Sequence, residues 1–108
     1  MDNRPLSQIY HDVGEQWADA EAAATIQEDL KSAFVSQKIQ EYMTMDPKMA
    51  LNKAEATVKA SPEWKSYVEK TVALRKKANY LKVQLTSIKM QAGEQASEEA
   101  NHRAATRL

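Results

Sequence analysis

The chain has 108 residues, a formal net charge of zero, 43% hydrophobic residues and only 6% aromatic residues. A chain of this length forms one small domain with a thin core, so we expect elongation or self-association to supplement the core. The absence of cysteine excludes disulfides, thiolate metal sites and cysteine nucleophiles. Two glycines, three prolines and no strand-like alternation predict a single all-α domain over residues 1–108.

A first long helix is predicted over residues 6–43. It begins after Pro5, because proline suits the first helical position. Apolar residues then recur every three or four positions, and Trp17 lies on this stripe. Gly14 lies inside the pattern, where a glycine costs about 1 kcal/mol relative to alanine. It marks either a kink or a place where another helix approaches closely.

Two proline signals divide the rest of the chain. Asp46 followed by Pro47 ends the first helix and predicts a capped short helix over 47–60. Ser61-Pro62 repeats the signal and predicts a long helix over 62–91. Over residues 93–108 the apolar pattern thins to alanines, so this tail is expected to be either helical or frayed.

The strongest pattern is a heptad seam from Trp64 to Ala92, in which apolar residues alternate at spacings of three and four for four repeats. Such a narrow stripe must be covered by another helix. The predicted anchors of helix pairing are Trp17, Trp64, Tyr67, Leu74, Leu81, Leu85 and Ile88. The fold predicted from this seam is a long, coiled-coil-like antiparallel hairpin with a short connecting helix. We expect a homo-oligomer to close it into a bundle, with its order left open.

The charge is unevenly distributed: residues 1–45 carry a net −5, residues 46–92 a net +6 and residues 93–108 a net −1. One interpretation is that the basic flanks of the seam pair with the acidic first helix. The other is that they track a phosphate backbone, with Tyr80 stacking on a base of single-stranded DNA. Tyr80 could instead belong to a second packing face with Val83 and Met90. The candidate nucleic-acid-binding residues are Arg75, Lys76, Lys77, Tyr80, Lys82 and Lys89.

Nothing in the sequence has the spacing of a catalytic, cofactor or metal site. His11 and His102 lack a second ligand at metal-binding spacing, and Glu15 with Asp19 has no accompanying Glu-x-x-His. We therefore predict a non-enzymatic protein without cofactors. No apolar run approaches a membrane span, and the first residues lack the apolar core of a signal peptide, so residence in the host cytoplasm is expected by default.

The second half of the chain resembles small all-helical proteins encoded by tailed bacteriophages. The resemblance is carried by Lys53-Ala54-Glu55-Ala56, by the stretch from Ala60 to Tyr67, by Arg75 to Val83 and by Ser97 to Arg103. It implies an accessory role in phage DNA replication or recombination, and it transfers no functional residue. The recombination mediators of T-even phages offer an analogy only in being helical and oligomeric.

Two functional hypotheses follow. In the first, the protein binds a protein partner from phage or host DNA metabolism, single-stranded DNA, or both. In the second, it is a purely protein-directed module, such as a host-factor inhibitor or an assembly chaperone, whose basic residues only neutralise the first helix. The positions of Arg75, Lys82 and Lys89 relative to the acids of the first helix discriminate between them.

Overall fold

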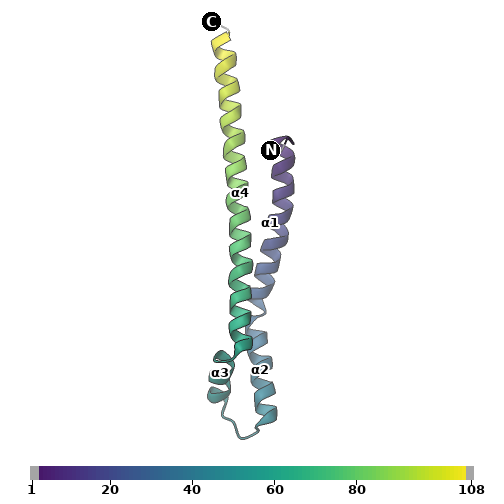
Figure 1. Cartoon of the computed structure of the whole chain (residues 1–108), viewed down its shortest axis with the longest axis vertical. Coiled ribbons are helices and arrows are strands. Elements are labelled where there is room, and N and C mark those ends of the chain that lie inside the picture. The colour runs from purple at the N-terminus through teal and green to yellow at the C-terminus, as the bar shows by residue number, and fades with distance from the viewer. Residues whose placement is uncertain (1–2, 107–108) are drawn as a thin grey trace.

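The computed structural model describes residues 3–106, which form an elongated helical rod measuring 87 × 20 × 19 Å (Figure 1). The helices of this part are α1 (Leu6–Asp29), α2 (Lys31–Met45), α3 (Leu51–Lys59) and α4 (Pro62–Thr106). The chain runs down α1 and α2, turns through α3 and returns along α4, so α4 is antiparallel to α1. The predicted fold class, an all-α antiparallel hairpin with a short connecting helix, is confirmed.

The long first helix has its interruption at Leu30, between α1 and α2. The helix continues through Gly14 without a break. At the junction the Leu30 N–H still donates to the Ile26 carbonyl at 3.0 Å, and the Leu30 carbonyl accepts from Phe34 at 2.9 Å. The chain is therefore bent rather than folded back, and α2 continues the general direction of α1 (Figure 1).

A side-chain contact coincides with this bend. The Tyr67 hydroxyl on α4 donates a hydrogen bond to the Gln27 carbonyl, three residues before Leu30. A side chain that bonds the helix backbone is a recognised cause of bending. The predicted alternative of a kink at Gly14 is therefore wrong, because a contact across the hairpin places the irregularity elsewhere.

The upper half of the hairpin packs through small residues. Its core contains Ala20 and Ala24 from α1 with Ala78 and Leu81 from α4, and Val13, Trp17 and Leu74 pack around them. Alanine at three of the four buried positions lets the two backbones approach closely, since helix separation follows the size of the contact side chains. This alanine contact gives a thin core, as expected for so short a chain.

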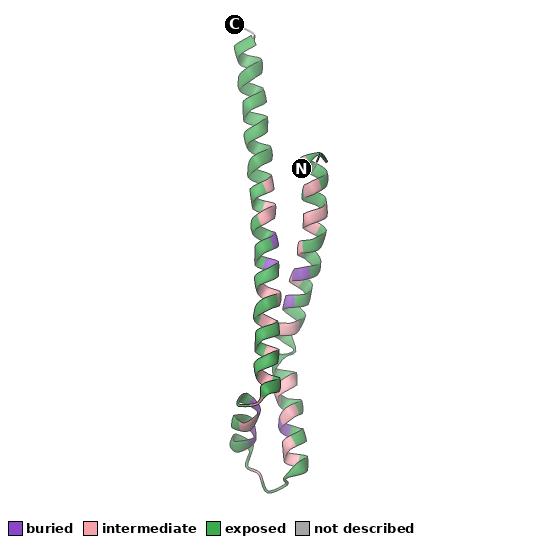
Figure 2. Cartoon of the chain, viewed as in Figure 1, coloured by how far each residue is buried: buried purple, intermediate pink, exposed green. Residues whose placement is uncertain are grey.

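The heptad seam of α4 faces the other helices. Along α4, Trp64, Tyr67, Thr71, Leu74, Ala78, Leu81, Leu85 and Ile88 are buried or half-buried, and the residues that point away from α1 are exposed (Figure 2). Ala92, the last seam position, is exposed. Among the predicted anchors, Trp17 packs against the α1–α4 core from α1. Most of the row is therefore covered within a single chain.

An aromatic cluster holds the start of α4 against α2. The rings of Phe34 and Tyr67 stack with centroids 4.6 Å apart, and Trp64 lies parallel to Tyr67 at 6.1 Å. The Lys31 ammonium sits 5.5 Å from the centre of the Trp64 ring, in a cation–π contact. The predicted anchors Trp64 and Tyr67 thus lie in an intramolecular contact.

The connecting helix begins later than predicted. Asp46 follows α2, and its carboxylate accepts the Lys48 N–H at 3.2 Å, which makes a local turn instead of capping a helix. Helix α3 starts at Leu51 without a side-chain cap, so the expected start at residue 47 is wrong. Its buried Ala54 and Val58 pack on Ile39 of α2. The second proline signal, Ser61-Pro62, acts as predicted, because the Ser61 hydroxyl accepts the Trp64 N–H at 3.2 Å and caps α4.

The end of α4 projects beyond the rest of the molecule. Helix α4 continues to Thr106, and every described residue from Lys89 onward is exposed (Figure 2). We call residues 93–106 the C-terminal extension; no other helix lies beside it (Figure 1). Residues 107–108 of the predicted tail lie outside the described residues. None of the described helices combines the length and the apolar character needed to cross a membrane.

Candidate nucleic-acid interface

Arg75 is the most strongly engaged of the predicted basic residues. Its guanidinium bonds Glu28 from Nε at 3.0 Å and from Nη2 at 2.5 Å, and Glu21 from Nη1 at 2.7 Å. Both acids lie on α1, next to the side of the helix that carries the buried Ala20 and Ala24. A guanidinium that holds two carboxylates has little capacity left for a phosphate. Arg75 therefore joins α4 to α1, and its place among the nucleic-acid candidates is not supported.

These bonds shift the ionisation of both partners. The hydrogen bonds to Glu28 and then to Glu21 raise the pKa of Arg75 above its usual value. The hydrogen bond from Arg75 lowers the pKa of the Glu28 carboxyl below its usual 4.5. The side chains of Glu21 and Glu28 remain 38% and 39% exposed, so water screens the attraction.

The other predicted residues lie on three different faces of α4. Lys77 flanks one edge of the seam, Lys82 and Lys89 flank the other, and Lys76 points away from α1 with Tyr80 beside it. All five are exposed, and no acid pairs with these lysines among residues 3–106. Tyr80 is 62% exposed, and its hydroxyl accepts a hydrogen bond from Gln84. These residues therefore do not form one continuous strip on the described surface of α4.

One edge of the hairpin brings two of these lysines together with aromatic residues. Lys82 and Lys89 line an open hollow of about 210 Å³ together with Leu85, Thr86, Tyr10 and Trp17. The lysines, Leu85 and Thr86 come from α4, whereas the two aromatic residues come from α1. We call this group the lysine–aromatic edge. Its predicted cations come from α4 and its aromatic rings from α1, so both long helices line this hollow.

The tryptophan of this edge carries an unused donor. The Trp17 indole N–H is shielded from solvent and has no hydrogen-bond acceptor. Burying such a donor without an acceptor costs about 1–3 kcal/mol. Tyr10 is 44% exposed and presents ring surface to water. The edge therefore offers positive charge, the complement of an anionic group, and exposed aromatic surface.

Sequence reasoning missed the contribution of α1 to this edge. Trp17 was predicted as a packing anchor, and Tyr10 was not among the predicted site residues. The sequence nevertheless contained a signal for this edge. Tyr10 and Trp17 are seven residues apart on one helix, and Lys82 and Lys89 are seven residues apart on the other. Two matching intervals of seven place four residues along one edge of a coiled-coil pair. Only the register between α1 and α4 in the structure shows that the two pairs of residues lie beside each other.

The histidines and acids form no metal site among residues 3–106. His11 pairs with Glu15 on the surface of α1, with Nε2 3.0 Å from Oε1. Nowhere in the described range do three histidine, aspartate or glutamate side chains gather closely enough to hold a metal ion. His102 is exposed on the C-terminal extension.

Comparison of the chain with models of protein families, with curated proteins and with solved structures gave no match. The resemblance to phage accessory proteins therefore stays a prediction. The functional proposal depends on the chain's own residues, above all on the lysine–aromatic edge.

Proposed function

We propose that this chain is a non-enzymatic, self-associating accessory protein that binds single-stranded nucleic acid along the lysine–aromatic edge. The observation that carries the proposal is the hollow in which Lys82 and Lys89, without acidic partners, lie beside Tyr10 and Trp17. In the cell this would be a role in phage DNA recombination or replication, carried out in the host cytoplasm, as the resemblance implies.

The composition of the edge matches what single strands require. Proteins that bind single strands combine a positively charged track for the backbone with aromatic rings on which bases stack. Lys82 and Lys89 lie two helical turns apart, about 10 Å along α4 at 1.5 Å per residue. Each ammonium can contact a separate phosphate, and the exposed ring of Tyr10 provides a stacking surface between the helices.

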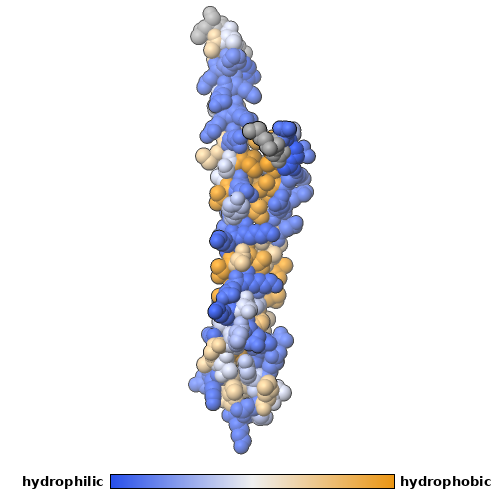
Figure 3. Space-filling view, in the orientation of Figure 1, coloured by the Kyte–Doolittle hydropathy of each residue, from blue (hydrophilic) through white to orange (hydrophobic). Residues whose placement is uncertain are grey.

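Self-association is supported by surface that a single hairpin leaves uncovered. Helix α4 exposes Val72, Val83 and Met90, each more than 60% accessible, on the side away from α1. Figure 3 shows hydrophobic patches along the middle of the rod and a mostly hydrophilic C-terminal extension. Exposed apolar side chains gathered on one side of a helix favour an interaction site there.

A salt titration of single-strand binding tests the proposal. Fluorescence anisotropy with a labelled single-stranded oligonucleotide should show binding that weakens with salt, with a slope of about 0.7 per contacted phosphate. The double variant Lys82→Gln/Lys89→Gln should bind more weakly and with a slope smaller by about 1.4, because two phosphate contacts are lost. The variant Lys65→Gln/Lys70→Gln removes the same charge elsewhere on α4 and should retain most of the affinity.

Two outcomes would overturn this assignment. One is the absence of binding at tens of micromolar protein in low salt. The other is equal loss of affinity in both double variants, which would show that net charge alone attracts the strand. Tyr10→Leu adds a third measurement, since loss of a stacking ring should cost about 1–3 kcal/mol in affinity.

The second candidate is the purely protein-directed module, and Arg75 favours it. This residue lies on the basic flank of the seam, yet it is held by Glu21 and Glu28 of α1. If the remaining lysines serve only solubility, the chain will not bind oligonucleotides but will capture a protein partner in a pull-down. The same titration therefore discriminates between the two functions.

A further inference from the structure

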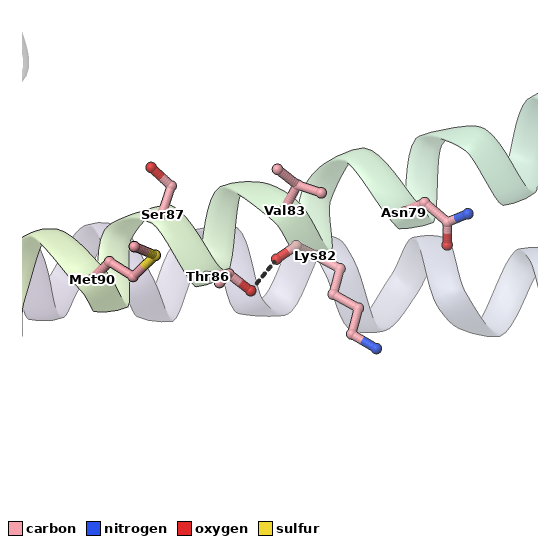
Figure 4. A pocket seen from close by; sticks show the side chains of 6 residues that line it. All are labelled: Asn79, Lys82, Val83, Thr86, Ser87 and Met90. Carbon is pink, nitrogen blue, oxygen red and sulfur yellow. Dashed lines mark hydrogen bonds between the residues drawn. The ribbon is translucent and has the colours of Figure 1, made fainter.

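The side of α4 opposite its seam carries a second stripe of residues. At 100° per residue, Val72 and Met90 lie about 180° from the buried Leu81, and Val83 lies about 200° from it. These three side chains are 61%, 62% and 66% exposed. Figure 4 shows Val83 and Ser87 projecting to one side of α4, whereas the Lys82 ammonium points to the other. We call the stripe formed by Val72, Lys76, Val83, Ser87, Met90 and Glu94 the outer face.

The charged residues of the outer face are unevenly distributed along α4. Its middle, from Val83 to Met90, is uncharged. On the N-terminal side lies Lys76, which has no acidic partner in the described chain, with the exposed Glu69 about two turns before it. On the C-terminal side lie Glu94 and Glu98, one helical turn apart and also without a described partner. The charges nearest the apolar middle are therefore a lysine on its N-terminal side and two glutamates on its C-terminal side.

Such a face is complementary to itself only when two copies run antiparallel. A two-fold axis at Ser87 places Met90 of one copy near residue 84 of the other, and it places Lys76 opposite Glu98 with Glu94 one turn away. Each dimer then contains two symmetry-related groups of one lysine and two glutamates. A parallel pair would instead place Lys76 against Lys76 and Glu94 against Glu94, which is repulsive.

The C-terminal extension points to the same arrangement. As a part of α4 with no neighbour, it is a stretch of 14 residues exposed on all sides. The extension continues α4 and needs no helix nucleus of its own, but no packing against another helix stabilises it. With the axis at Ser87, the extension of one copy lies opposite residues 68–81 of α4 in the other copy. The partner thereby covers the segment that the hairpin itself leaves without support.

We propose that two copies of this chain pair antiparallel through the outer faces of their α4 helices, with the two-fold axis at Ser87. This inference rests on the self-association in the proposed function and specifies its surface. Lys76 and Tyr80 belong to this contact, whereas Lys82 and Lys89 stay at the lysine–aromatic edge. Pairing and nucleic-acid binding therefore use different residues of one helix.

Disulfide trapping tests the position of the axis, because the chain has no cysteine of its own. The single variant Ser87→Cys should form a disulfide-linked dimer under mild oxidation, since the two copies of residue 87 meet at the axis. Ser66→Cys, on the same helix but far from the axis, is the matched control and should stay monomeric on a non-reducing gel. Lys76→Cys alone should not link, whereas Lys76→Cys/Glu98→Cys should.

Charge reversal gives a second, independent measurement. Lys76→Glu and Glu98→Lys should each weaken the dimer about tenfold, which corresponds to ~1.4 kcal/mol, because each reversal creates like-charge contacts twice per dimer. The double variant Lys76→Glu/Glu98→Lys restores opposite charges and should recover most of the affinity. Sedimentation equilibrium measures the dissociation constants, and circular dichroism verifies that each variant is helical.

The outcomes separate this inference from the function on which it rests. A monomer by light scattering at all concentrations would overturn both the antiparallel dimer and the self-association. A dimer in which Ser87→Cys does not link, or in which Lys76→Cys links alone, would overturn the antiparallel contact and leave self-association intact. Linking at Ser87 together with rescue by the double reversal would establish the proposed geometry.

Discussion

Arg75 on α4 holds Glu28 on α1 through two hydrogen bonds, from Nε at 3.0 Å and from Nη2 at 2.5 Å. The paired geometry matches the planar fork of a guanidinium to a carboxylate and fixes the relative position of the two helices. Glu21, seven residues before Glu28, occupies the third nitrogen at 2.7 Å. Glu21 lies within the stretch of the alanine core and Glu28 lies just before the bend at Leu30, so the contact joins α4 to α1 over two turns of helix.

Replacing Arg75 by glutamine should lower the melting temperature slightly and in a salt-dependent manner. The change leaves two neighbouring carboxylates without their cation, but both remain partly exposed and screened by water. Thermal unfolding followed by circular dichroism should show a smaller difference from the wild type at high salt than at low salt. Lys77→Gln is the control, because Lys77 has no described acidic partner; an equal effect of both variants would contradict the role given to Arg75.

Stability should fall in acid partly through Glu28. Its pKa is lowered in the folded protein by the hydrogen bond from Arg75, so the bond contributes stability that is fully present above 4.5. This contribution is lost as the pH falls from 4.5 through the lower folded-state pKa. Urea unfolding across this range should show a weaker pH dependence for Glu28→Gln than for the wild type. Identical pH profiles would show that Glu28 gains nothing from the bond.

Ala24→Leu should destabilise the hairpin although it adds an apolar group. Ala24 is fully buried in the close contact between α1 and α4, where a larger side chain forces the helices apart. Overpacking of this kind typically costs about 1–3 kcal/mol. The neighbouring Ala23 is exposed, so Ala23→Leu should leave the free energy of unfolding nearly unchanged. Urea denaturation of the two variants measures the difference, and equal stabilities would refute the close alanine contact.

Gly14→Ala should stabilise the protein by up to about 1 kcal/mol, the helix-propensity difference between the two residues. Gly14 has helical backbone geometry inside α1, and an added Cβ would lie 3.9 Å from Leu85 Cδ2, which is ordinary van der Waals contact. The melting temperature of the variant provides the measurement. A lower value would show that α4 approaches Gly14 too closely for a methyl group.

The helical class and the inward face of α4 were predictable from the sequence, because both depend on local spacing. A 3.5-residue period selects one side of a helix whatever covers it, and the seam from Trp64 to Ile88 lies on the less exposed side of α4. The proline signal at Ser61 was equally local, and the Ser61 hydroxyl caps α4. These features need no knowledge of distant contacts.

Features for which the local sequence allows two conformations could not be predicted in this way. The bend at Leu30 coincides with a bond from Tyr67, forty residues away in the chain. Asp46 was predicted to start a helix because its carboxylate suits a cap, but it makes a turn with Lys48 instead. In each case a local preference was compatible with two outcomes, and a neighbouring group selected one of them.

The basic residues that flank the seam show most clearly what could be predicted from the sequence and what required the structure. Arg75, Lys82 and Lys89 repeat every seven residues and are equivalent in the sequence pattern. In the structure, Arg75 meets two acids of α1, whereas Lys82 and Lys89 lie beside Tyr10 and Trp17. The sequence alone determined that these cations flank a buried seam, because periodicity is a property of one helix. Only the tertiary structure decided which of them are neutralised, because the register between two helices sets which side chains come within bonding distance.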